Sequence, residues 1–226
     1  MSEDRLELRL GGKIFTGWKD VRVTRGVDRA VSDFDIEVSE KFPDAGAAPA
    51  APRLSPIKIF DSCVVSIAGE PILTGFVDSY LPAYAPTQHA VRITGRSKTQ
   101  DLIDCAYEQK GGQFRGYKLD AIARAVAAKF GIAVVVEADV GKPFPDVQRE
   151  HHEKAFHFIE RLARLREILL TDDAQGRLVL TRAGAQRATD RLVQGQNILH
   201  ATATLSGADR FSEYIVKSQA GEAAGG

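Results

Sequence analysis

The prolines of this chain are confined to one part of it. Seven of the nine fall between Pro43 and Pro86, and none follows Pro145. Proline has no backbone N–H and breaks helices, but it fits strand edges and loops. The first hundred residues are therefore predicted to form short strands joined by turns.

Within that region, apolar and polar residues alternate again and again. Predicted strands of this kind begin at Leu6, Val21, Phe34, Cys63, Ile72 and Val91. A period of two places successive side chains on opposite faces, so that one face is buried and the other is wet. Gly11-Gly12 and residues 68–71 supply tight turns. We predict an antiparallel sheet over residues 1–105, curled into a barrel.

Two features interrupt the predicted strands of this domain. Gly75 lies inside a strand, which indicates a bulge or a close backbone contact. Residues 44–56 are low in complexity and consist mainly of Ala and Pro with a few polar residues. Such a segment cannot pack a core, and we expect a mobile loop inserted between strands.

The apolar spacing changes to that of helices further along the chain. Apolar residues separated by three or four positions precede Gly131 and are Leu119, Ile122, Ala123, Val126 and Phe130. This spacing predicts an amphipathic helix that ends at the glycine. A buried strand, Ile132–Val136, is predicted to follow.

A second helix is predicted from about Glu153 to about Arg166. Its expected apolar side comprises Phe156, Ile159, Leu162 and Ala163. Ile168–Thr171 and Leu178–Thr181 are separated by turn-forming residues and are predicted to form a hairpin. Residues 106–182 are therefore expected to form a small α+β domain.

Residues 183–226 return to a strand-like pattern. Ile198–Leu205 and Phe211–Lys217 resemble the earlier segments around Val21–Val23 and Phe34–Val38. This faint repeat predicts the first strands of a second, incomplete barrel, followed by a linker-like tail. Two strands cannot bury a core alone, so they must pack on other domains, other subunits or further chain. The predicted fold class is α+β, mainly β.

The charge balance restricts the kinds of partner. The chain has 30 Lys+Arg and 30 Asp+Glu, which argues against binding to nucleic acid or anionic lipid by bulk charge. No apolar run approaches the roughly 20 residues that span a bilayer, and the charged N-terminus is unlike a signal peptide. Cys63 and Cys105 are expected to be reduced thiols.

The densest group of possible metal ligands lies before the second predicted helix. His151, His152, Glu153 and His157 are close in sequence, and Glu153 and His157 have the i, i+4 spacing of paired ligands. The alternative is a solvated helix start, with Glu153 near the positive end of the helix dipole. We favour this alternative because the chain has no His-Glu-x-x-His order.

Cys105 follows Asp104, as the nucleophile does in one class of peptidoglycan peptidases. Such an enzyme needs a thiolate at a helix start and a histidine base nearby. Here Ala106 and Tyr107 follow the cysteine instead of Ser and Gly. We therefore expect Cys105 to be a buried small residue that closes a structural segment.

Three further patterns do not indicate a catalytic or phosphate-binding site. Glu137 and Asp146 have a separation compatible with a lysozyme-like pair, but His152 stands where such a pattern would have Thr. Asp172 and Asp173 lie in a hairpin turn, where Asp is favoured for backbone reasons alone. The glycine-rich segment 111–116 lacks the Lys-Ser/Thr ending of a phosphate loop.

By elimination, the chain is expected to be a non-enzymatic assembly or interaction protein. No catalytic residue, metal site or cofactor is predicted. Basic residues of the second helix are interleaved with acids, and Glu160 and Arg164 have the favourable helix spacing. This pattern indicates a solvated surface stripe.

The order of the sequence blocks resembles that of the Mu-like phage baseplate hub family of contractile tails. The resemblance covers nearly the whole chain, and the block from Gly95 to Cys105 is its most specific part. The blocks that carry it are Gly17–Arg25, Phe34–Glu40, Gly69–Asp78, Val91–Cys105, Arg161–Arg166, Leu169–Asp173 and Gly176–Thr181.

The resemblance implies two tube-like β-barrels with smaller α+β domains between them, as in the N-terminal part of type VI secretion spike proteins. It also implies a homotrimer whose six barrels form a ring of near-sixfold symmetry. Such a ring joins the hexameric tail tube to the trimeric central spike and contacts other baseplate subunits. The expected location is the virion tail, after synthesis in the bacterial host cytoplasm. Family members are longer, and the second barrel is only begun here.

Two other functions stay open from the sequence. One is a tail-tip enzyme that cuts peptidoglycan through Cys105 or a carboxylate pair. The other is a component of a type VI secretion spike.

Overall fold

The computed structural model describes most of the first 184 residues and scattered parts of the rest. The described residues are 6–39, 57–85, 88–106, 113–184, 191, 193–198, 200–208, 211–213 and 215. The chain divides into two units, Met1–Ala183 and Gly184–Gly226. The predicted mobile loop 44–56 lies outside the described residues.

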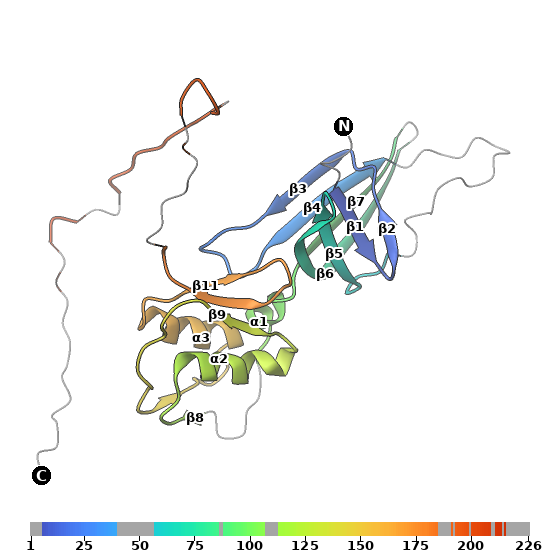
Figure 1. The fold of residues 1–226 in the computed structure, drawn as a ribbon. Coiled ribbons are helices and arrows are strands. Elements are labelled where there is room, and N and C mark those ends of the chain that lie inside the picture. The colour runs from blue at the N-terminus through green and yellow to red at the C-terminus, as the bar shows by residue number, and fades with distance from the viewer. Residues whose placement is uncertain are drawn as a thin grey trace, which may run out of the picture. The chain divides into compact units, whose positions relative to one another are not determined.

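A seven-stranded antiparallel sheet forms the first part of the chain (Figure 1). Its order is β2-β1-β5-β6-β7-β4-β3. The strands are β1 (Leu6–Leu10), β2 (Lys13–Phe15), β3 (Asp20–Thr24), β4 (Asp33–Ser39), β5 (Ser62–Ile67), β6 (Glu70–Ala85) and β7 (Gln88–Ser97). The predicted antiparallel sheet is thus confirmed.

The sheet curls without closing into a barrel. Leu8 on β1 and Ile36 on β4 belong to one buried cluster, although β1 and β4 are not neighbours in the sheet. Both side chains are fully buried, so the inner face folds over a common core. Among the described strands, β2 and β3 are the two edges of the sheet, and they do not pair with each other. The barrel expected from the sequence is therefore open at this point.

Close backbone contacts shape the middle of the sheet. A Cβ atom at Gly75 would lie 1.8 Å from the backbone oxygen of Arg96, so β6 and β7 can approach only because this residue is glycine. The close contact predicted at Gly75 is present. The register shifts of β6 lie elsewhere, opposite Val65/Ser66 of β5 and between Val77 and Ser79.

A small α/β module follows the sheet (Figure 1). Its elements are α1 (Gln100–Asp104), β8 (Gln113–Phe114), α2 (Leu119–Ala127), a 3₁₀ turn η1 (Ala128–Phe130), β9 (Val134–Val136), β10 (Val147–Gln148), α3 (Ala155–Arg164), β11 (Leu169–Asp172) and β12 (Leu178–Thr181). Strand β12 pairs with β11 in antiparallel fashion and with β9 in parallel. The predicted helices and hairpin are confirmed, whereas the strand predicted at Ile132–Val136 is shorter, Val134–Val136, and half-buried instead of buried. The elements α1, β8 and β10 were not predicted because they are very short.

The module has its own apolar core, separate from that of the sheet. The α2 residues Leu119, Ile122 and Val126 are fully buried, as the helical spacing predicted. Gly131 ends the helical segment with φ of +67°, a conformation that favours glycine. On α3, Phe158 is fully buried while Phe156 is only half-buried, so the apolar side includes a residue that the spacing analysis omitted.

The predicted strands of the last part are not present in the described residues. Residues 200–208 form no strand, and neither do the described residues between 211 and 215. Leu205 is 97% exposed and Phe211 is 65% exposed. Two strands alone cannot bury their side chains, and the described residues offer these segments no packed surface.

Candidate functional site

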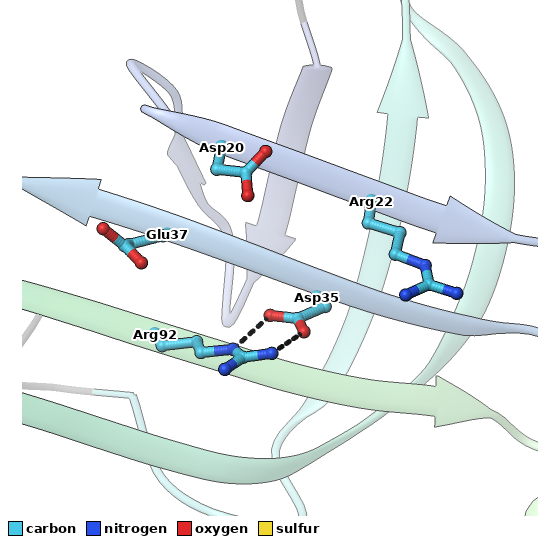
Figure 2. A pocket seen from close by; sticks show the side chains of 5 residues that line it. All are labelled: Asp20, Arg22, Asp35, Glu37 and Arg92. Atoms are coloured by element: carbon cyan, nitrogen blue, oxygen red, sulfur yellow. Dashed lines mark hydrogen bonds and ion pairs between the residues drawn. The ribbon is translucent and has the colours of Figure 1, made fainter.

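A shallow charged depression lies on the outer face of β3, β4 and β7 (Figure 2). We call it the charged face, and it has a volume of about 230 Å³. Its residues are Asp20 and Arg22 on β3, Asp35 and Glu37 on β4, and Arg92 on β7. They share one face because the residues between them, such as Ile36 and Ile93, point into the core.

The strand register explains how these charges pair. Arg22 stands opposite Asp35, and Glu37 stands between Asp20 and Arg92. Arg92 reaches diagonally to Asp35, donating from Nε at 2.7 Å and also from its terminal nitrogen. Glu37 instead accepts a hydrogen bond from Lys19 Nζ at 3.4 Å. The face therefore mixes both signs, with Asp20 and Glu37 as a like-charged pair.

The electrostatics of the charged face do not favour proton transfer. The hydrogen bond from Arg92 holds the pKa of Asp35 below its ordinary value despite partial burial. The same hydrogen bond raises the pKa of Arg92. Both groups stay charged near neutral pH, and a carboxylate that serves as general acid needs the opposite shift. The arrangement suits a contact surface for charged and polar groups of a protein partner.

Cys105 lies at the end of α1 and is exposed, so the expectation that it is buried is wrong. Its backbone carbonyl accepts a hydrogen bond from Ala155 N at 3.2 Å, at the start of α3. The backbone of Cys105 thus joins the end of α1 to the start of α3, and this contact does not require a buried thiol. The described contacts of the chain include none between Cys105 and an imidazole.

The histidine cluster is arranged as a polar helix start. Among the described residues no group of three His, Cys, Asp or Glu could hold a metal ion. The rings of His151 and His152 lie 3.9 Å apart between centroids. The carboxylate of Glu153 accepts hydrogen bonds from Nε and Nη2 of Arg161, at 3.0 Å each. The structure thus pairs Glu153, which precedes α3, with a cation on that helix.

The pKa of the Glu153 carboxyl group is shifted by its surroundings. Burial raises its pKa, but hydrogen bonds from Arg161 and from Glu150 N outweigh burial and leave the pKa below its ordinary value. The carboxylate therefore stays ionised and fixes the segment before α3 to the helix.

The lysozyme-like pair is not assembled. Glu137 and Asp146 are both exposed. The carboxylate of Asp146 accepts hydrogen bonds from Gln113 Nε2 at 2.7 and 2.9 Å and from Arg115 Nε at 3.2 Å. A general acid requires an apolar cleft, which neither residue occupies.

The two hairpin aspartates have different roles, which the sequence interpretation did not separate. Asp173 accepts hydrogen bonds from the backbone N–H groups of Gln175 and Arg177, as expected for a turn aspartate. Asp172 is buried and accepts hydrogen bonds from Ser32 Oγ at 2.8 Å and Ser32 N at 3.1 Å. The interpretation of Asp172 as a turn residue is wrong, because its carboxylate contacts a loop 140 residues earlier in the chain.

The glycine-rich segment 111–116 is only partly described. Gly111 and Gly112 lie outside the described part, while Gly116 has φ of +70° and donates its N–H to Phe144 O at 2.9 Å. The glycine therefore serves a turn. Within the described segments, no helix has both the length and the apolar content required to cross a membrane.

Two family models match consecutive parts of the chain. Residues 5–97 match the N-terminal domain of Mu phage baseplate assembly protein GpP-like proteins. Residues 99–182 match the second domain of baseplate hub protein gp44-like proteins. The two matches meet at Lys98, where the sheet ends and the module begins.

Known proteins of similar sequence and fold come from phages and prophages. Baseplate hub protein gp44 of Escherichia phage Mu is 35% identical over 216 residues, which covers 94% of this chain and 55% of that protein. The chain thus spans about half the length of this relative. The crystal structure of the 43 kDa tail protein of prophage MuSo2 from Shewanella oneidensis is similar with a TM-score of 0.86 and 39% identity, covering 92% of this chain and 63% of the other.

A more distant structure shares the fold. The tail protein from Neisseria meningitidis MC58 has a TM-score of 0.65 at 21% identity, covering 78% of this chain and 49% of that one. The sheet and module, the two consecutive family matches and the similarity to gp44 agree with one another. Residues 5–97 and 99–182 thus match, in order, domains of Mu-like phage baseplate hub proteins.

Proposed function

We propose that this chain is a structural hub subunit of a contractile phage or prophage tail. The single observation that carries the proposal is its 35% identity with baseplate hub protein gp44 along 94% of its length. In the proposed role it forms a homotrimer that joins the tail tube to the central spike and contacts other baseplate subunits. The protein would be made in the host cytoplasm and incorporated into the virion tail.

The described surfaces suit assembly better than catalysis. The charged face presents fixed groups of both signs, which favour specific orientation of a protein partner. Among the described strands, β2 and β3 form the two edges of the sheet, and strand addition at such edges is a recurring mode of protein association. We further propose that residues 183–226 open the second barrel when further chain or other subunits cover them.

The hub role is tested in the bacterium that carries the gene. Disrupting the gene should abolish tails that bear a complete baseplate, and a plasmid copy should restore them. An antibody against the protein should label the junction of tube and spike in electron micrographs of purified tails. Complete contractile tails in the absence of the gene would contradict the proposal.

The trimer and the absence of catalysis are tested on the purified protein. Light scattering should give a mass three times the 24.6 kDa of the chain, whereas a strict monomer at high concentration would contradict the trimer. We propose that the protein has no catalytic centre, so a zymogram with purified cell wall should show no band of lysis. Lysis that disappears in Cys105→Ala would contradict this.

A further inference from the structure

The sheet and the module do not share an apolar core. Most buried apolar residues form two separate clusters, one in the sheet domain and one in the module, whereas buried Val31 and Val179 belong to neither. The family matches place only Lys98 between the two domains. Apolar packing inside each domain stabilises that domain but gives no preference for one mutual orientation. What fixes the orientation must therefore come from the contacts where the two domains meet.

The contacts around the β11–β12 hairpin include directional hydrogen bonds. Thr74 Oγ1 on β6 donates a hydrogen bond to Ala174 O at 2.7 Å. Thr171 Oγ1 donates to Gly26 O at 3.0 Å. A Cβ atom at Gly176 would lie 2.6 Å from Thr74 O, so the hairpin turn approaches the β6 backbone closely. Hydrogen bonds of this kind are directional and hold their partners at a defined angle.

Asp172 is at the centre of this junction. Among the described residues it is the charged side chain with the least exposure, at 5%, and it lies beside the buried hydroxyl of Ser32. Ser32 donates both Oγ–H and N–H to its carboxylate. Ser97 Oγ lies 3.2 Å from Ser32 N and 2.8 Å from Thr99 Oγ1, which extends the buried network to the two residues that flank Lys98.

A buried carboxylate discriminates strongly between orientations. In another arrangement of the domains, Asp172 would lose the donors of Ser32, and any arrangement that still covered it would leave a buried carboxylate without a partner. A buried polar group left without a partner costs about 1–3 kcal/mol, and a charged one costs more. An apolar contact of the same area would tolerate sliding, because it has no directional requirement.

We propose that Asp172 is a positioning residue that locks the α/β module onto the sheet in one orientation, so that the sheet and the module act as one rigid body. The lock consists of the Asp172 carboxylate, both donors of Ser32 and the close approach at Gly176. It concerns the chain itself and holds whether or not the hub function proposed above is correct.

The test measures how widely the distance between the domains is distributed. Two spin labels are attached at Arg92→Cys on the sheet and Arg164→Cys on α3, in a Cys105→Ser background. Both arginines are well exposed. The labelled protein is diluted with an excess of unlabelled protein, so that distances between subunits do not contribute. Double electron–electron resonance with Asp172 unchanged should then give one narrow distance distribution. Asp172→Ala should broaden it at least twofold while circular dichroism stays the same, and an unchanged width would overturn the proposal.

Further variants keep the test decisive. If Asp172→Ala does not fold, Asp172→Asn retains the volume and one acceptor and should broaden the distribution less; no broadening would overturn the proposal. Asp139→Ala removes an exposed carboxylate of the module and should leave the width unchanged.

Salt distinguishes the buried lock from exposed ion pairs at the same junction. Arg96 on β7 also contacts Asp104 of α1, at 2.8 Å, and this pair is partly exposed. Salt at 1 M reduces the screening length to about 3 Å and weakens such pairs, but it affects buried ones much less. The narrow distribution should therefore persist at 1 M salt. Broadening by salt alone would assign the orientation to Arg96 and overturn the role of Asp172.

Discussion

Replacing Gly95 by alanine should destabilise the sheet strongly. A Cβ atom there would lie 2.3 Å from the backbone oxygen of Phe76 and 2.5 Å from two ring carbons of Phe34, against 3.4 Å for an ordinary contact. Phe34 is only 1% exposed, so its ring has no free space to enter. Overpacking of this kind costs about 1–3 kcal/mol, and the backbone clash places Gly95→Ala at the upper end of the range.

The assay is thermal unfolding monitored by circular dichroism. A loss of about 3 kcal/mol corresponds to a decrease in Tm of roughly 6–12 °C for a chain of this length. Gly184→Ala is the matched control, since its Cβ would meet no atom within 4 Å, and it should change the free energy of unfolding by less than about 0.5 kcal/mol.

A double variant identifies the source of the clash. Phe34→Leu removes the ring atoms that the new methyl group would meet, so Gly95→Ala should cost less in this background than in the native one. Strict additivity of the two changes, or native stability of Gly95→Ala, would refute the reasoning.

Three further predictions concern individual side chains. Native protein should react with one equivalent of a thiol reagent at pH 8, at exposed Cys105, and with a second only after unfolding, because burial raises the pKa of Cys63 to about 12. Glu153→Gln should cost about 1 kcal/mol at neutral pH. Since the folded pKa of Glu153 lies below its ordinary value of 4.5, the ion pair contributes fully above that pH. Its contribution should fade as the pH falls through the lower folded pKa, which acid titration of both proteins would reveal. Arg92→Ala should leave the Tm almost unchanged in thermal melts, because the Arg92 side chain of this ion pair is largely exposed to water.

Most elements of the fold could be predicted from local patterns. Alternation placed Leu8, Ile36 and Ile93 on the buried face of their strands, and spacing of three and four placed Ile122 and Val126 on the buried side of α2. These patterns depend only on the repeat of a strand or a helix, so they are visible in the sequence without knowledge of the neighbours. The strands expected after residue 197 show the limit, because a strand forms only beside a partner that the described chain does not offer.

The candidate sites were harder to predict because they depend on pairing across long separations. Arg92 and Asp35 meet only because β7 lies beside β4, although 57 residues separate them. Cys105 was expected to be a buried small residue, but it is exposed, because the exposure of its side chain depends on what packs around α1.

The sequence by itself determined the period of each segment, and with it the antiparallel sheet, the α/β module and the family resemblance. Only the tertiary structure decided between Asp172 and Asp173, two identical residues adjacent in one hairpin. One holds its own turn and the other is buried against Ser32. The physical reason is that burial and hydrogen-bond partners are set by the surface that reaches a residue in three dimensions, and a local pattern carries no information about that surface.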